Sequence, residues 1–110
     1  MHMQMQETVA NVASATAATA TATAAGQTGK RFFLVSASFQ FSGVASVSPP
    51  VRATITDGIS TLGFGVGTNG LIFQPANPIP FVAGQTVSAA LPSGGVGAVG
   101  DVVITGYYAD

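Results

Sequence analysis

The side chains that most often carry catalysis are scarce in this chain. Its only histidine is His2, and its four carboxylate residues are Glu7, Asp57, Asp101 and Asp110. A nucleophilic triad needs a carboxylate that orients the histidine, and none is indicated beside His2. A glycosidase pair would have to be Asp57 with Asp101, about 5 to 10 Å apart in a groove, and nothing in the sequence brings these two together. We therefore predict that the protein is not an enzyme.

Metal and cofactor sites are not indicated either. The chain has no cysteine, and a zinc site needs a cluster of Cys, His or carboxylate ligands. Residues 63–67 contain a GxG motif, but no helix follows whose N-terminus could hold a phosphate. Residues 94–97 lack the Lys-Ser or Lys-Thr of a phosphate-binding loop. We expect no catalytic residue, no metal ion and no cofactor.

Charged side chains make up 6% of the 110 residues, against about 25% in a typical soluble protein. The basic residues are Lys30, Arg31 and Arg52. They cannot neutralise the roughly six or more phosphates that a nucleic-acid-binding protein contacts, so we exclude DNA and RNA as partners. The formal net charge is −1, and so little charge gives little repulsion between copies. Such a surface tolerates close neighbours.

A membrane segment and an export signal are also not expected. Residues 8–25 carry no charge, but they are mainly Ala and Thr and lack the transfer free energy of a membrane-spanning helix. Residues 1–6 contain no Lys or Arg, and no Leu-rich run follows them. This pattern does not match a secretory signal.

Composition changes sharply at Gly26. Half of residues 8–25 are alanine, and Thr and Ala alternate from residue 19 to residue 24. A period of two places the hydroxyl groups on one face of an extended chain and the methyl groups on the other. We predict that residues 1–25 form an extended Ala/Thr-rich N-terminal arm or a first strand, and that residues 26–110 form the body.

The body consists of short apolar segments separated by turn residues. Alternation predicts strands at residues 51–56, 59–66 and 86–91, and residues 99–108 are apolar on both faces, which is typical of a central strand. About seven or eight such strands without a helical period predict an all-β fold, an antiparallel β-sandwich or jelly roll. The clearest strand should turn these side chains toward the core: Phe33, Val35, Ala37, Phe39 and Phe41.

The surface residues that could make contacts are threonines of the arm and a tyrosine pair near the C-terminus. Neighbours on a strand point to opposite sides, so one of the two tyrosines should face outward. A regular threonine array could also bind ice, but its spacing breaks at residues 17–18. The predicted interaction residues are Thr16, Thr19, Thr21, Thr23, Tyr107 and Tyr108.

Four segments carry a resemblance to a known class of protein. They are GQTGKR at 26–31 before a hydrophobic strand, the TDG turn at 56–58, the NPIP run at 77–80 and GDVVITGYY at 100–108. Together they resemble small β-sandwich virion structural proteins of tailed bacteriophages, of the head decoration or cement type. The resemblance covers residues 8–108 and rests on turn and strand patterns, so it transfers no functional residue.

The resemblance implies a non-enzymatic capsid decoration or cement protein that stabilises the phage head. We expect it to act through β-sandwich bodies, with residues 1–25 lying across a neighbouring copy. Its expected partners are itself, as a homotrimer, and the major capsid protein or another virion protein, in a virion assembled in the host cytoplasm. The alternative is a tail or fibre subunit that binds a receptor or a carbohydrate. A bacterial surface or matrix subunit is less favoured because no export signal is indicated.

Overall fold

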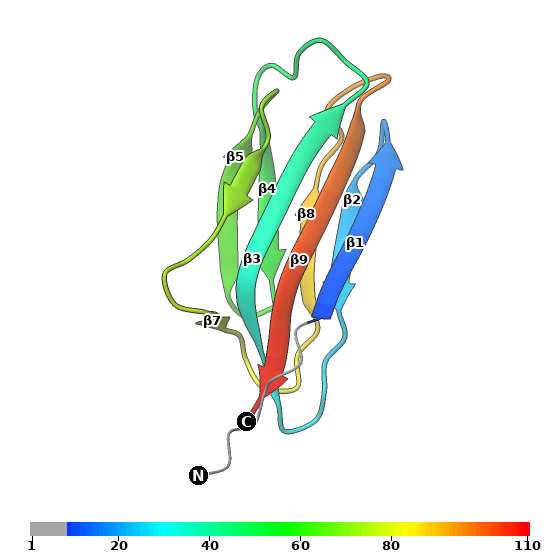
Figure 1. The fold of residues 1–110 in the computed structure, drawn as a ribbon. Helices are drawn as coiled ribbons and strands as arrows, with labels where there is room; N and C mark the ends of the chain where they lie inside the picture. Colours follow the sequence, from blue (N-terminus) through cyan, green and yellow to red (C-terminus); the bar gives the residue numbers. More distant parts are fainter. Residues whose placement is uncertain (1–8) are drawn as a thin grey trace.

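The period-two patterns of the sequence form the strands of two antiparallel sheets that pack face to face (Figure 1). The fold is therefore the β-sandwich that the sequence predicts. The computed structural model describes residues 9–110, so the predictions that fall on His2, Glu7 and the rest of residues 1–8 lie outside the described residues. Within residues 9–110, no helix is long and apolar enough to cross a membrane.

Sheet A contains, in spatial order, β1 (Val9–Thr16), β9 (Val99–Ala109), β3 (Arg31–Ser42) and β6 (Leu71–Phe73), and β7 (Ile79–Pro80) also pairs with β3. The central strands β9 and β3 pair along almost their whole length. The last strand is therefore central, as its two apolar faces predict. Prolines lack the N–H that a central strand donates, and the proline-rich stretch 75–80 contributes only the short edge strand β7.

Sheet B contains, in spatial order, β2 (Ala20–Ala24), β8 (Val87–Leu91), β4 (Val51–Thr56) and β5 (Thr61–Val66). The strand predicted from residue 59 begins two residues later, because residues 57–60 form the turn between β4 and β5. The N–H of Asp57 donates to the carbonyl of Ser60 at 3.2 Å, and Gly58 adopts a φ of 88°. Positive φ is the conformation that glycine takes at little steric cost.

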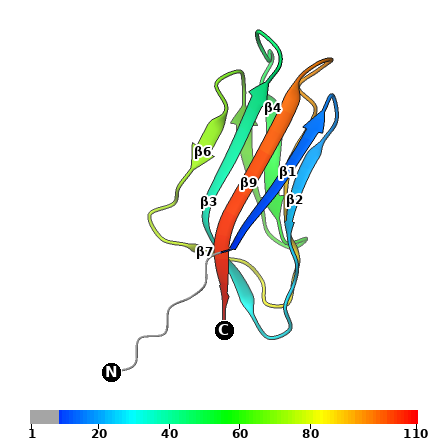
Figure 2. The ribbon, with the colours of Figure 1, turned by 45° about the vertical axis from the view of Figure 1, so that its right-hand side comes forward.

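Residues 9–24 contribute one strand to each sheet. β1 pairs with β9, β2 pairs with β8, and the two lie side by side at one edge of the sandwich (Figure 2). The chain changes sheets at Ala17, which has a φ of 53° and donates its N–H to the carbonyl of Ala98. Part of the segment predicted as an arm or a first strand, residues 9–24, thus forms two edge strands, because pairing within the chain satisfies their backbone hydrogen bonds.

The core lies between the sheets and is built from both. Alternation in β2 turns Ala20, Ala22 and Ala24 inward and leaves Thr21 and Thr23 exposed, which confirms the predicted separation of methyl and hydroxyl groups. Phe81 adds to the core from the β7–β8 loop. The largest fully buried side chains are Phe32, Phe39, Leu34, Ile55, Leu91, Ile104, Val66, Val87 and Val102.

β3 departs from regular pairing at Val35. Its neighbours Leu34 and Ser36 pair with the adjacent residues Gly106 and Thr105 of β9, so Val35 is an extra residue in the ladder. An insertion of this kind is a β-bulge, which bends a strand and reverses the direction of the side chains that follow.

The bulge overturns part of the predicted inward face of β3. Phe32 points into the core before the bulge, and Ala37 and Phe39 point into it afterwards. Phe33 and Val35 were predicted to point inward with them, and this prediction is wrong. Phe33 is half-buried on the outer side, and the side chain of Val35 is 36% exposed.

Candidate interaction surfaces

The four threonines predicted to make contacts do not form one surface. Thr16 ends β1 at an exposed position of sheet A, whereas Thr21 and Thr23 lie on the outer face of sheet B. Thr19 is exposed in the turn between the two strands. The interruption at residues 17–18 is the point at which the chain changes sheets, so the predicted array is divided there.

Thr21 and Thr23 belong to a broader surface, here named the hydroxyl face. Strand pairing aligns their row with side chains of β8, β4 and β5, and the Thr61 hydroxyl donates to Oγ1 of Thr56 at 2.9 Å. The guanidinium of Arg52 lies over Gly63, at 2.6 Å between its Cζ and the place where a Cβ would stand. The hydroxyl face consists of Thr21, Thr23, Thr54, Thr56, Thr61 and Ser88.

Tyr107 and Tyr108 point to opposite sides of β9, as predicted. Tyr108 packs against the core, with its ring edge-on to Phe32 at a centroid distance of 5.4 Å. Its hydroxyl donates to the carbonyl of Ala25 at 2.8 Å, and burial raises the pKa of that hydroxyl. Tyr108 therefore ties the β2–β3 loop to the sandwich.

Tyr107 lies on the outer side of sheet A, where its ring stacks on Phe33. The ring centroids are 5.2 Å apart and the rings are within 9° of parallel. Pro80 of β7 pairs with Phe33 on the side away from Tyr107, so the aromatic pair extends toward an edge of the sheet. Sequence reasoning missed Phe33, because it placed this side chain in the core.

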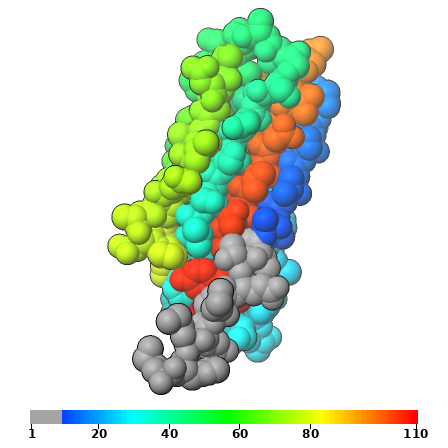
Figure 3. All heavy atoms as spheres, in the orientation of Figure 1, coloured from blue at the N-terminus to red at the C-terminus, as the bar shows by residue number. Residues whose placement is uncertain are grey.

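A second row of residues crosses the same side of sheet A, two outward positions along β9 from the aromatic pair. Pairing aligns Val12 of β1, Val103 of β9, Ser38 of β3 and Ile72 of β6. Val12 is 68% exposed and Ile72 is 63% exposed. Figure 3 shows this side of the molecule, with β1, β9, β3 and β6 next to one another. The apolar face, as we name it, consists of Val12, Phe33, Val35, Ile72, Val103 and Tyr107.

The sequence holds a partial signal for the apolar face. Residues 102–104 and 107–108 are apolar at consecutive positions, and a strand cannot bury both sides unless both are covered. Phe32 to Val35 form a similar run, so alternation cannot show where the bulge lies or which of the two phenylalanines faces outward. The pairing of the strands supplies this information.

The carboxylates lie apart. Oδ1 of Asp57 accepts the N–H groups of Ile59 at 2.8 Å and Ser60 at 2.6 Å, and Oδ2 accepts that of Val82 at 2.8 Å. Burial acts to raise the pKa of this carboxyl, but the backbone hydrogen bonds outweigh it and the pKa lies below its ordinary value. Asp101 is paired with Gln40, near the C-terminal end of β3. The loop that Asp57 binds, which contains Val82, lies near the other end of β3.

Residues 9–110 enclose no pocket. They also contain no group of three or more His, Cys, Asp or Glu side chains that could hold a metal ion. Comparisons with known protein families, curated proteins and solved structures give no match.

Proposed function

We propose that the protein is a non-enzymatic structural protein of a tailed bacteriophage virion, a decoration or cement subunit that stabilises the head. The observation that carries the proposal is the apolar face. It places exposed apolar side chains and a stacked aromatic pair on the outer side of a sheet in a chain with only 6% charged residues. Several exposed apolar side chains gathered on one face are typical of a protein–protein contact.

The composition supports attachment by many weak contacts. A lattice of copies raises the effective concentration of each contact, so modest individual affinities combine into tight attachment. The small hydroxyl-bearing and apolar side chains of both outer faces allow close approach without charge repulsion. The proposed partners are other copies of the chain, as the homotrimer that the resemblance implies, and the major capsid protein or another virion protein.

The test is the abundance of the chain in purified virions of the phage that encodes it. Quantitative mass spectrometry should find it in a fixed, high ratio to the major capsid protein, and particles made without it should lose their DNA at lower temperature. Absence of the chain from virions would contradict the proposal.

Rebinding to particles that lack the chain tests the surface. Val103→Lys places a charge at the centre of the apolar face and should weaken rebinding. Ala90→Lys places the same charge on the outer side of the central strand β8 of sheet B and is the matched control. Equal loss with both variants would contradict a role of the apolar face.

The Phe33–Tyr107 pair favours one second candidate, a tail or fibre subunit that binds a carbohydrate. Half-exposed aromatic rings can pack against the apolar side of a sugar ring. A few copies per virion, together with glycan binding that Tyr107→Ala abolishes, would favour this candidate over the head protein.

A further inference from the structure

We propose that the apolar face binds the apolar face of a second copy of this chain, in a two-fold arrangement with the strands of the two copies running in opposite directions. The proposal concerns the isolated protein: it replaces the homotrimer that the resemblance implies by a pair of chains, and it does not rest on their place in a virion. It follows from the order of the outward side chains along β9 and β3.

Successive outward positions of β9 form an ordered series. They are Asp101, Val103, Thr105, Tyr107 and Ala109, and each is paired with an outward position of β3, except that the bulge at residue 35 intervenes between the third and the fourth. Thr105 stands in the middle. We place a two-fold axis between the two copies, above Thr105 and at right angles to the strands. Rotation about this axis brings each outward position of one copy over the position of the other copy that lies equally far from Thr105 on the opposite side.

This exchange brings apolar groups into contact. The row that contains Val103 in one copy comes to face the row that contains Tyr107 in the other. The aromatic pair of Tyr107 and Phe33 then covers Val103, with Val12 and Ile72 of the same row on either side. Both copies contribute both rows, so the contact is made twice.

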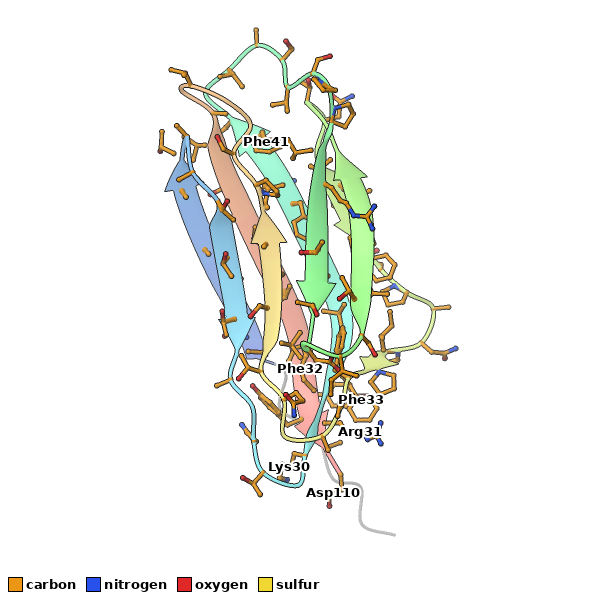
Figure 4. The ribbon with its side chains drawn as sticks, turned by 180° about the vertical axis from the view of Figure 1, so that it is seen from behind. Lys30, Arg31, Phe32, Phe33, Phe41 and Asp110 are labelled. Carbon is orange, nitrogen blue, oxygen red and sulfur yellow. The ribbon has the colours of Figure 1, made fainter. Side chains whose placement is uncertain are left out.

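The same exchange brings opposite charges together. Arg31 is exposed in the row of Ala109, and Asp101 lies at the other end of the series. Figure 4 shows Arg31 and Phe33 at the end of the molecule that carries Lys30 and Asp110, opposite to Phe41. The two-fold axis places Arg31 of each copy beside Asp101 of the other, and two opposite-charge pairs form.

Charge also selects this arrangement over its nearest competitor. A two-fold axis parallel to the strands would place Arg31 near Arg31 and Asp101 near Asp101. Like charges brought together at an interface are unfavourable and suppress the wrong orientation. The hydroxyl face offers no comparable choice, because Arg52 is the only charged residue in the strands of sheet B.

The available area suits a stable pair. From the ordinary strand spacing and rise, the 34 residues of β1, β9, β3 and β6 cover roughly 550 Å². Two copies would then bury roughly 1,100 Å² together, just above the roughly 1,000 Å² that a specific interface needs. Two sheets that pack through apolar side chains are also the arrangement already present inside the sandwich.

The first experiment measures the dissociation constant of the full chain by sedimentation equilibrium. The unchanged protein should form a two-chain species. Arg31→Asp and Asp101→Arg should each raise the dissociation constant at least about tenfold, and the double variant should recover most of the loss because it exchanges the charges. Arg52→Asp, on the other sheet, is the matched control and should leave the dissociation constant unchanged.

Three outcomes would overturn the proposal. They are a chain that stays monomeric at millimolar concentration, single variants that dissociate no more than Arg52→Asp, and a double variant that does no better than the singles. A trimer that is insensitive to Arg31→Asp would also overturn it, while leaving the virion role open. Circular dichroism of each variant confirms that the sandwich is folded.

A second experiment tests the position of the axis. The chain has no cysteine, so Thr105→Cys introduces a single thiol close to the predicted axis. A short bis-maleimide whose reach matches the roughly 10 Å between packed sheets should join two Thr105→Cys chains efficiently. Ala90→Cys on sheet B should give little product. Equal yields from the two variants would refute the proposed contact.

Discussion

The two edges of the sandwich fill the space between the sheets in opposite ways. At the edge formed by β1 and β2 the inward side chains are mainly alanines, and Cα atoms of β2 and β9 approach within 8 Å across the interior. Packed sheets are more often about 10 Å apart. At the edge formed by β5 and β6, Phe64 packs against Phe39 and Phe73, with ring centroids 5.9 and 4.9 Å apart. The sandwich is therefore thin at the alanine edge, formed by β1 and β2, and thick at the phenylalanine edge, formed by β5 and β6.

The difference explains what the low-complexity segment does. A buried methyl group contributes about 0.8 kcal/mol, so the alanines alone cannot hold β1 and β2 in place. Their small size lets the backbones come close, and the ladders to β9 and β8 supply the hydrogen bonds. The phenylalanine edge instead relies on large rings. Stability should therefore depend on large side chains at the edge formed by β5 and β6, and on small side chains at the edge formed by β1 and β2.

The largest expected effect is at the phenylalanine edge. Phe39 is fully buried against Phe64, and Phe39→Ala should lower the free energy of unfolding by about 3 to 5 kcal/mol, because it removes a ring and leaves a cavity. Urea denaturation followed by circular dichroism measures the change. Ala22→Gly, the corresponding truncation at the alanine edge, should cost only about 1 kcal/mol. Equal losses would mean that the two edges do not differ as described.

The second expected effect is the reverse experiment at the alanine edge. Ala22 is 2% exposed in the middle of β2, a strand that approaches β9 across the interior, so Ala22→Leu should lower the free energy of unfolding by about 3 kcal/mol through overpacking. The measurement is thermal or urea unfolding beside the control Ala90→Leu, on the outer side of the neighbouring strand. Ala90→Leu should change the free energy by no more than about 0.5 kcal/mol. A neutral Ala22→Leu would show that the thin edge has room.

The sequence predicts most of the fold because alternation in single strands follows from local chemistry. The separation of methyl and hydroxyl groups in β2, the strand at residues 51–56 and the central position of β9 are all confirmed. The bulge at Val35 was not predictable, because it lies in a run that is apolar on both sides. The change of sheet at Ala17 depends on which strands accept β1 and β2, and local patterns do not carry that information.

The interaction surface was predictable only in part. The adjacency of Tyr107 and Tyr108 predicts that one of the two faces outward, and this prediction is confirmed. The apolar face joins residues from β1, β3, β6 and β9, which are far apart in the sequence. Val12 and Ile72 meet Val103 in one row only because of the order and register of the strands. Such a row cannot be assembled before the pairing is known.

The smallest expected effect concerns a polar contact beside the phenylalanine edge. Asp57 closes the turn between β4 and β5, and its carboxylate accepts three backbone N–H groups from other residues. Asp57→Asn should lower the free energy of unfolding at pH 7 by about 1 to 2 kcal/mol, because an amide cannot accept hydrogen bonds on both sides. Urea denaturation measures this loss. Asp101→Asn, which removes a carboxylate elsewhere, should cost no more than about 0.5 kcal/mol.

The same contact should make the two edges respond differently to acid. The pKa of Asp57 is lower in the folded chain than in the unfolded one, so its contribution is complete at neutral pH. It is lost as the pH falls below about 4, the ordinary value for an aspartate. Hydrogen exchange at acidic pH should therefore show protection falling first in β5, while β2 keeps its protection because no carboxylate closes the turn at residues 17–19. Asp57→Asn should remove this difference in pH dependence. Protection that falls first in β2 would contradict this prediction. So would an earlier loss in β5 that persists in Asp57→Asn, because the Asp57 carboxylate would then not be its cause.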